Sequence, residues 1–273
     1  MKLIFLDIDG TLTEPGSNVP PESALKAIRK TQENGNLVFL CTGRNYAMLK
    51  PLLEYGFDGM VASAGGYVTI RDQVIYDHPM PQEDLEKALE VLHRNGVFCT
   101  VETKDATYGD ENLGDFLSQA SGNNSEIERW RKALSETLHI LPMKDYDGRP
   151  AYKIVIMCQE AGQLAEAREL FETDYDFCIQ EVSAHGNCQN GELINRAFDK
   201  GKGIRMIAET LNVPIEDVYG FGDSMNDLTM IETVGVSVCM ANGAEALKAI
   251  SDLVVPSVTE EGLFKGFEQL GLI

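Results

Sequence analysis

The sequence predicts an α/β fold with a mainly parallel sheet, and three observations support this prediction. Short apolar runs bounded by glycine or asparagine alternate with amphipathic segments near both ends of the chain. The middle region has an α/β rhythm of its own. Junctions that contain proline, glycine and polar residues separate this middle region from the two ends. We therefore expect a core that is split by an inserted α/β domain.

The outer parts of the chain carry the elements of the expected core. Each apolar run has the length of a strand, and each amphipathic run has the length of a helix that covers a sheet. Pro51 lacks a backbone N–H, so the second helix should be kinked or begin late. The strands are expected at 2–7, 36–41, 59–62, 217–221, 235–239 and 252–255. The helices are expected near 21–34, 45–55, 203–211, 225–233, 243–250 and 260–270.

The middle region predicts a second, smaller sheet with helices. One helical face is marked by apolar residues at i, i+3, i+4 and i+7, namely Leu85, Ala88, Leu89 and Leu92. A further helix should begin behind a capping box of Ser125 and Glu128. Strand-like runs lie at 97–103, 151–158 and 176–183. The junctions at 77–82 and 183–191 predict a core of residues 1–81 and 190–273 and an inserted domain of residues 82–189.

The charge balance limits the partners of this chain. Its 23 Lys and Arg residues stand against 43 Asp and Glu residues, a formal net charge of −20. Such a chain is repelled by polyphosphate backbones, so nucleic acid and anionic membranes are not expected partners. A small anionic substrate would need a locally positive pocket. The sequence does not indicate the oligomeric state.

The cysteines and the first residues favour a cytoplasmic protein. The six cysteines form no CxxC pair and mostly lie in strand-like runs, which is typical of reduced thiols in a core. The apolar run that begins at Leu3 reaches Asp7 after only four residues, too short for the core of a signal peptide. The four histidines show no HxH or HExxH spacing, so zinc-dependent hydrolysis lacks its usual ligands.

Two acids interrupt the first predicted strand at its end, in the stretch "KLIFLDIDGTL". Asp7 and Asp9 are two residues apart, so in an extended chain their side chains leave the same face. The carboxyl ends of parallel strands are where ligands bind in open α/β sheets. Two crowded carboxylates repel each other, and a hard divalent cation such as Mg²⁺ resolves that repulsion. The alternative is a turn whose acids only cap backbone amides.

Two other strand ends carry polar groups of the same kind. Thr42 and Gly43 follow the second strand, where a hydroxyl and backbone N–H groups could bind an oxyanion or simply cap a helix. Asp223 follows the strand at 217–221, and Asn226 and Asp227 come three and four residues later. If a helix opens at Ser224, Asp223 and Asp227 can both face the strand end and form a second acidic pair.

One lysine could supply the positive charge that these acids require. The stretch "FDKGKGI" places Lys200 and Lys202 among glycines immediately before a predicted helix. A lysine on such a loop can balance phosphate charge, although a solvated loop lysine is the simpler interpretation.

In order, "DIDGTL", "TGR", a glycine-flanked lysine and "GDSMND" resemble the four motifs of the haloacid dehalogenase (HAD) superfamily of phosphohydrolases. The insertion lies between the second and third motifs, and its element pattern resembles the type IIB cap of the Cof-like group. The resemblance implies a Rossmann-like parallel-sheet core with an inserted cap domain. Relatives often carry Asn-Gly after the third core strand, whereas this chain has Gly65 and Gly66 in "SAGGYV".

The resemblance also implies roles for the motif residues. Asp7 matches the nucleophile that forms an aspartyl-phosphate, and Asp9 matches the general acid and base. Thr42, together with Gly43, matches the phosphate-binding position. Lys200 matches the lysine that screens phosphate and nucleophile, with Lys202 as the less favoured register.

A magnesium site is implied by the same motifs. Asp7, the backbone carbonyl of Asp9 and Asp223 match the metal positions of the family. Asn226 and Asp227 match the outer residues that support the metal and its loop. Bound Mg²⁺ and Lys200 would create the positive pocket that an acidic chain needs to bind a phosphate monoester.

The sequence therefore predicts a magnesium-dependent phosphohydrolase of small phosphorylated metabolites, such as sugar phosphates or phosphorylated cofactors. The alternatives are a phosphotransferase similar to phosphomannomutase and a non-catalytic ligand-binding module on the same scaffold. Arg44, His185 and Asn187 are expected as possible substrate contacts. The residues that select the physiological substrate carry no recognisable motif.

Overall fold

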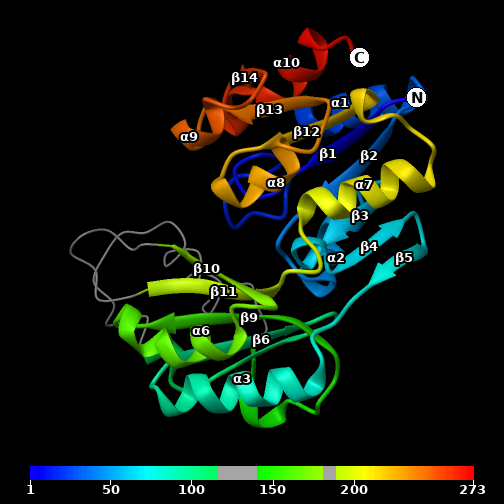
Figure 1. Cartoon of the computed structure of the whole chain (residues 1–273). Helices are drawn as coiled ribbons and strands as arrows, with labels where there is room; N and C mark the ends of the chain where they lie inside the picture. The colour runs from blue at the N-terminus through cyan, green and yellow to red at the C-terminus, as the bar shows by residue number, and fades with distance from the viewer. Residues whose placement is uncertain (116–139, 181–188) are drawn as a thin grey trace. The chain divides into compact units, whose positions relative to one another are not determined.

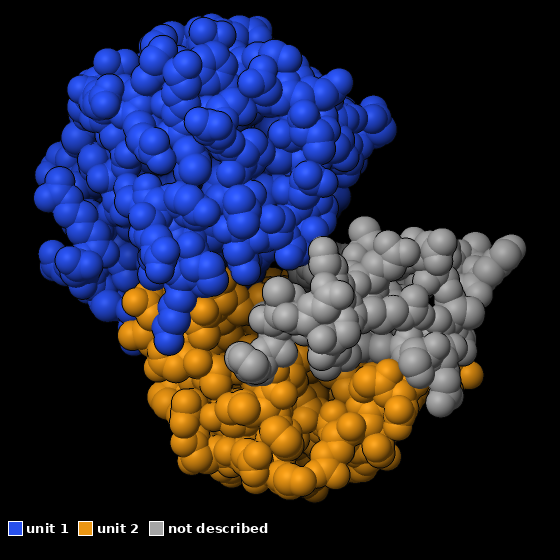
Figure 2. Space-filling view, turned by 180° about the vertical axis from the view of Figure 1, so that it is seen from behind, with its two compact units in different colours: residues 1–44, 49–77, 198–273 blue, residues 45–48, 78–197 orange. Residues whose placement is uncertain are grey.

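The structure is a computed structural model that describes residues 1–115, 140–180 and 189–273. The chain divides into two compact units (Figures 1 and 2). Unit 1 contains residues 1–44, 49–77 and 198–273, and unit 2 contains residues 45–48 and 78–197. The expected helix behind Ser125 and the junction residues 183–188 lie outside the described residues.

The second boundary between the units differs from the predicted residue 190. Strand β11 (Gln189–Asn195) pairs antiparallel with β9 (Ala151–Cys158) on one side and with β10 (Tyr175–Gln180) on the other. Its backbone hydrogen bonds therefore tie it to the sheet of unit 2. The sequence predicted a polar junction here because the segment has no continuous apolar run.

Unit 1 is built on an eight-stranded sheet. The strand order is β14-β13-β12-β1-β2-β3-β4-β5, parallel from β14 to β3 and antiparallel from β3 to β5. The order places β1 at the centre, between β12 and β2, and β1 is buried along its whole length. The strands are β1 (Leu3–Leu6), β2 (Leu37–Cys41), β3 (Gly59–Ala62), β4 (Tyr67–Ile70), β5 (Gln73–Asp77), β12 (Val218–Gly222), β13 (Val236–Met240) and β14 (Leu253–Val255).

Helices cover both faces of this sheet (Figure 1). On one face, apolar residues of α7 and α8 pack against Phe5 and Phe39, whose rings stack at 5.0 Å. On the other face, α1 packs beside α10, and Phe267 of α10 contacts Phe221 of β12 at 5.2 Å between ring centroids. The helices are α1 (Glu22–Glu33), α2 (Tyr46–Leu53), α7 (Lys200–Thr210), α8 (Leu228–Ile231), α9 (Glu245–Lys248) and α10 (Gly262–Gln269), with 3₁₀ turns η1 (Ser63–Gly65), η5 (Ile215–Asp217), η6 (Met225–Asp227) and η7 (Val258–Glu260).

The hairpin formed by β4 and β5 was not predicted. Its second strand lies at the edge of the sheet, and its apolar run of Val74, Ile75 and Tyr76 is only three residues long, with every residue of the strand exposed or half-buried. The turn between the strands contains Arg71 with φ of 51°. An exposed edge strand buries few side chains, so its sequence carries only a weak hydrophobic pattern.

Unit 2 contains a six-stranded sheet with helices on one face (Figure 1). The strand order is β10-β11-β9-β6-β7-β8, antiparallel except for the parallel pair β7 and β8. Leu85 and Leu92 of α3 are buried against Val101 and Ile154 of the sheet, as the helical spacing predicted. The remaining elements are α3 (Gln82–Arg94), β6 (Phe98–Thr103), β7 (Thr107–Gly109), β8 (Ile140–Pro142), η3 (Met143–Asp145), η4 (Ala161–Leu164) and α6 (Ala165–Phe171).

The described residues bear on two features of the chain, its cysteines and the character of its helices. No cysteine in this part of the chain forms a disulfide. None of the described helices combines the length and the apolar character that a membrane span requires.

The turn after β3 stores backbone strain. Ser63 and Ala64 have φ values of 50° and 56°, a left-handed conformation that residues with a Cβ rarely adopt. Gly65 follows, and a Cβ at this position would lie 2.4 Å from the backbone oxygen of Asp199. The turn is held because Ala64 N donates to the carbonyl of Thr42 at 3.0 Å. Strained turns of this kind cluster at functional sites.

Replacing Ala64 by glycine should stabilise the chain. Relief of the left-handed strain contributes about 1–2 kcal/mol, and the extra backbone entropy of glycine opposes it by about 0.5–1 kcal/mol. We expect Ala64→Gly to raise the free energy of unfolding by about 0.5–1 kcal/mol in urea denaturation. Ala62→Gly is the matched control: Ala62 is buried with an extended backbone, so this change should destabilise. A loss of stability in Ala64→Gly would contradict the assignment of strain.

Candidate active site

The sheet order brings several strand ends of unit 1 together. Asp7 follows β1, Thr42 follows β2 and Asp223 follows β12, and these three strands are neighbours. Because parallel strands end at one edge, their following residues meet there. The approach is fixed by backbone bonds: Asp7 N donates to Phe221 O at 3.0 Å, and Thr42 N donates to Val61 O at 2.8 Å.

Lys200 lies inside this group of strand ends. Its Nζ donates to Oδ1 of Asp7 at 2.7 Å and to Oδ1 of Asp227 at 2.6 Å. The residue is only 4% exposed, so the two ion pairs are shielded from water. We expected this lysine on a loop, but it is the first residue of α7, with Asp199 as the N-cap that accepts from Lys202 N at 2.8 Å. The N-cap fixes the helix start and therefore the direction of the lysine.

Asp227 organises the loop after β12. A 3₁₀ turn opens behind Ser224, and Oδ2 of Asp227 accepts from the backbone N–H groups of Asp223 and Ser224, both at 3.0 Å. Its other oxygen binds Lys200, and the side chain is completely buried. Both carboxylate oxygens are thus engaged by the protein. Asn226, in the same turn, is exposed.

The group holds more negative than positive charge. Three carboxylates, Asp7, Asp223 and Asp227, surround the single ammonium of Lys200, a net charge of −2 when all are ionised. Burial, with the neighbouring Asp227, raises the pKa of Asp7 to about 7 despite the ion pair with Lys200. Burial, with Asp7 and Asp227, raises the pKa of Asp223 to about 8. The lysine keeps its charge, because Asp227 and Asp7 outweigh burial and raise its pKa.

These acids fit a divalent metal ion. One oxygen each of Asp7, Asp223 and Asp227 lies within 4.8 Å of the others. Oδ1 of Asp223 is buried and has no hydrogen-bond partner among the described residues. A buried carboxylate oxygen in this position suits a hard cation, which prefers oxygen ligands. Asp7 and Asp223 are the direct candidates, since the oxygens of Asp227 already bind protein donors.

The loop after Asp7 packs closely against the acid after β12. Gly10 has φ of 89°, and a Cβ there would lie 2.3 Å from Oδ2 of Asp223. The carbonyl of Gly10 accepts from Nδ2 of Asn242, in the loop after β13, at 2.8 Å. Asn242 is not among the site residues predicted from the sequence, because a single loop asparagine carries no signal of its own. Its contact fixes the loop that bears Asp7 and Asp9.

The hydroxyl of Thr42 is buried and held by one backbone hydrogen bond. It accepts from the backbone N–H of Arg44 at 3.1 Å, and the residue is 2% exposed. A hydroxyl that accepts this bond still has its own hydrogen to donate. Gly43, between the two residues, is half-buried.

Asp9 does not lie where the spacing predicted. An extended chain would place Asp7 and Asp9 on one face, but β1 ends at Leu6 and the chain turns. The Asp9 carboxylate lies outside the group of three acids and binds Arg44 through both oxygens, with distances of 2.9 and 2.7 Å. The N–H of Gly16 adds a third bond at 2.8 Å. The structure therefore separates the two acids by giving each its own cation.

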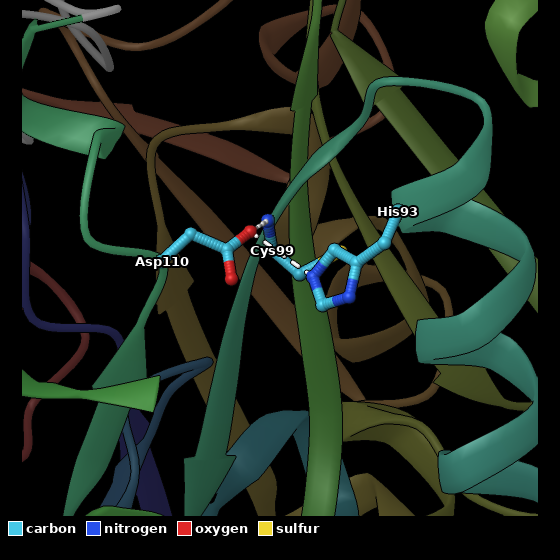
Figure 3. Close-up of side chains that lie close together, drawn as sticks. All are labelled: His93, Cys99 and Asp110. Atoms are coloured by element: carbon cyan, nitrogen blue, oxygen red, sulfur yellow. Dashed lines mark hydrogen bonds and ion pairs between the residues drawn. The ribbon is translucent and has the colours of Figure 1, made fainter. Parts of the chain in front are cut away.

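A second group of potential metal ligands lies in unit 2 (Figure 3). Oδ2 of Asp110 accepts from the backbone N–H of Cys99 at 2.7 Å and contacts Nε2 of His93 at 3.1 Å. The bond to Asp110 raises the pKa of His93. Burial raises the pKa of the Cys99 thiol well above its usual value, so the thiol stays protonated. We interpret this group as a structural tie between α3, β6 and the residue after β7.

Two expected substrate contacts cannot be placed. His185 and Asn187 lie outside the described residues.

The sheet order and the acids at its carboxyl edge define a Rossmann-like hydrolase core with an additional α/β unit. A family model of haloacid dehalogenase-like hydrolases matches residues 4–267. The chain belongs to this family and is a HAD-type phosphatase. Phosphatases of this superfamily generally use a divalent metal ion.

Curated proteins and solved structures are similar over the whole length. YkrA of Bacillus subtilis (strain 168) is 31% identical over 100% of this chain and 98% of its own. The 5-amino-6-(5-phospho-D-ribitylamino)uracil phosphatase YwtE of the same organism is 28% identical over 99% of this chain and 98% of its own. The structure of a HAD subclass IIB sugar phosphatase has a TM-score of 0.78 at 22% identity, covering 100% of both chains. The fold is thus that of subclass IIB.

Removing the buried lysine should destabilise the chain strongly. Lys200→Met leaves the buried carboxylates of Asp7 and Asp227 without their cation, a loss of about 3–5 kcal/mol for a broken buried ion pair. Urea denaturation in the presence of a chelator measures the change. Lys202→Met is the matched control: this side chain is 47% exposed, and its loss should change stability by less than about 0.5 kcal/mol. Equal effects of the two substitutions would contradict the role given to Lys200.

Proposed function

We propose that this HAD-type phosphatase hydrolyses small phosphorylated metabolites with Mg²⁺ bound between Asp7 and Asp223, through a phosphoryl group carried on Asp7. The observation that carries the proposal is the group of three acids around one lysine, in which Asp7, Asp227 and Lys200 are buried and Asp223 is half-buried. YwtE and the Escherichia coli (strain K12) pyridoxal phosphate phosphatase YbhA, 23% identical over 96% of both chains, support the substrate class. In this proposal unit 1 is the catalytic core and unit 2 is the cap that selects substrates.

Asp7 is the nucleophile in this mechanism. Lys200 holds its Oδ1 at 2.7 Å, which orients Oδ2 as the attacking oxygen. A bond forms between this oxygen and phosphorus, and the bond from phosphorus to the leaving oxygen breaks. The leaving oxygen takes a proton from the carboxyl group of Asp9, which enters this step in its protonated form and leaves it as the carboxylate. In the second step a water gives a proton to Asp9 and attacks phosphorus, which releases inorganic phosphate and restores the Asp7 carboxylate.

The surrounding residues stabilise the charge of the transferring group. The ammonium of Lys200 and the hydroxyl of Thr42 are fixed donors near the nucleophile. Bound Mg²⁺ would offset the excess carboxylate charge and polarise the phosphoryl oxygens. Because these donors are held by α7 and by the segment after β2, they need little rearrangement during the reaction.

A cytoplasmic location is part of the proposal. The described cysteines form no disulfide, and reduced thiols are typical of that compartment.

Asp7→Asn should abolish turnover while the chain stays folded. The amide removes the nucleophile, so inorganic phosphate release from a panel of phosphate monoesters should fall by at least about 10³-fold. The wild type should be silenced by a chelator and restored by Mg²⁺. Asp72→Asn, in the exposed turn between β4 and β5, is the matched control and should keep full activity. Circular dichroism checks the fold of each variant.

Two outcomes would contradict this proposal. Phosphate release by Asp7→Asn at the wild-type rate would exclude Asp7 as the nucleophile. A wild type that isomerises hexose 1-phosphate without releasing phosphate would instead be a phosphomutase.

A further inference from the structure

Arg44 makes an unusually complete set of contacts beside the proposed active site. Its Nε donates to Oδ2 of Asp9 at 2.9 Å, and its Nη2 donates to Oδ1 of the same carboxylate at 2.7 Å. Nη1 donates to Oδ1 of Asn18 at 2.7 Å, and Nη2 also reaches the carbonyl of Ser17 at 3.4 Å. The arginine side chain is 9% exposed and that of Asp9 is 17% exposed. This is a largely buried, bidentate ion pair.

The donor count argues against a direct contact between Arg44 and a substrate. A guanidinium has five N–H donors. Four hydrogen bonds to Asp9, Asn18 and Ser17 already use four of them. To bind a substrate phosphate, Arg44 would have to break its bidentate pair with the Asp9 carboxylate. The new ion pair would only replace one of similar strength, so little binding free energy would be gained. The geometry therefore directs Arg44 toward the protein, in contrast to the substrate contact expected from the sequence.

The backbone of the same residue orients Thr42. The N–H of Arg44 donates to the Thr42 hydroxyl at 3.1 Å, and the carbonyl of Arg44 accepts from Ser63 N in the strained turn at 2.9 Å. One residue thus connects the phosphate-binding segment after β2 with the carboxylate of Asp9. A shift of Arg44 would move both groups.

We propose that Arg44 is a positioning residue that holds the Asp9 carboxylate in place for proton transfer and keeps it out of the metal-binding group of Asp7 and Asp223. This inference rests on the proposed function and deepens it. Without the guanidinium, the carboxylate of Asp9 would lose the bidentate pair that fixes the plane of its two oxygens, although Gly16 N would still donate to Oδ1 at 2.8 Å. It would then be a fourth acid without its own cation next to a group that already has a net negative charge.

The proton-transfer role predicts a dependence on the leaving group. An alkoxide needs the proton that Asp9 supplies when the bond from phosphorus to oxygen breaks, whereas p-nitrophenolate leaves without protonation. Loss of positioning should therefore affect an alkyl phosphate much more than p-nitrophenyl phosphate. A merely structural role would affect both substrates equally.

The test measures kcat/KM, which reports the first phosphoryl transfer, for glycerol 3-phosphate and p-nitrophenyl phosphate with Mg²⁺. We expect Arg44→Ala to lose about 10²-fold on glycerol 3-phosphate and less than about 10-fold on p-nitrophenyl phosphate. Arg44→Lys keeps the charge but cannot form the bidentate pair, so it should show the same selectivity with a smaller loss. Arg149→Ala is the matched control, because Arg149 makes an equally bidentate pair with Asp147 at an exposed position of unit 2.

A double-mutant cycle separates the two roles of Arg44. If Arg44 acts through Asp9, Arg44→Ala should cost less than about 3-fold on glycerol 3-phosphate in an Asp9→Asn background. Full additivity, or equal losses on both substrates, would overturn the positioning role while leaving the proposed function intact. A wild type with no Mg²⁺-dependent phosphatase activity would overturn the proposed function and this inference with it.

Discussion

The buried ammonium of Lys200 is the interaction on which the rest of the site depends. It binds Asp7, which follows β1 and lies 193 residues before the lysine in the sequence, and Asp227, which lies 27 residues after it in the turn behind β12. One side chain thereby joins the ends of two neighbouring strands. Buried charged side chains are tolerated in a protein core only when each ion is paired and hydrogen-bonded. Because one cation faces three acids, the pairing is incomplete, and Asp223 is the acid left in excess. In the proposed function, the same imbalance that opposes stability favours the binding of a divalent metal ion.

The fold supplies this arrangement through backbone features rather than through side chains alone. The N-cap of α7 directs Lys200 inward, and the 3₁₀ turn behind Ser224 lets Asp227 bind two backbone amides while it faces the lysine. The left-handed turn at Ser63 and Ala64 fixes the segment that carries Thr42 and Arg44. The strain of that turn is located beside the group that it positions, which is the expected place for a functional constraint.

The sequence predicted the mainly parallel core and an acidic group after each of two strands, Asp7 with Asp9 and Asp223 with Asp227, since each group follows an apolar run. The place of Lys200 beside Asp7 was implied only by the resemblance to the family motifs, because a lysine among glycines is by itself also typical of a solvated loop. The sequence did not predict the hairpin of β4 and β5, whose edge strand β5 has only three consecutive apolar residues, or the membership of β11 in unit 2, because that strand is mostly polar. The separation of Asp9 from Asp7 was also missed. Period-two spacing holds only within a strand, and β1 ends before the first acid.

The central claim is that excess carboxylate charge at Asp7, Asp223 and Asp227 creates the metal site. Thermal unfolding of the wild type and of Asp223→Asn, each with MgCl₂ and with NaCl of matched ionic strength, tests this claim most directly. Without Mg²⁺ and at about pH 9, above the raised pKa of Asp223, Asp223→Asn should melt at a higher temperature than the wild type, because one of the repelling charges is gone. Mg²⁺ should raise the melting temperature of the wild type but not that of the variant. A variant that is no more stable than the wild type and responds equally to Mg²⁺ would contradict the account.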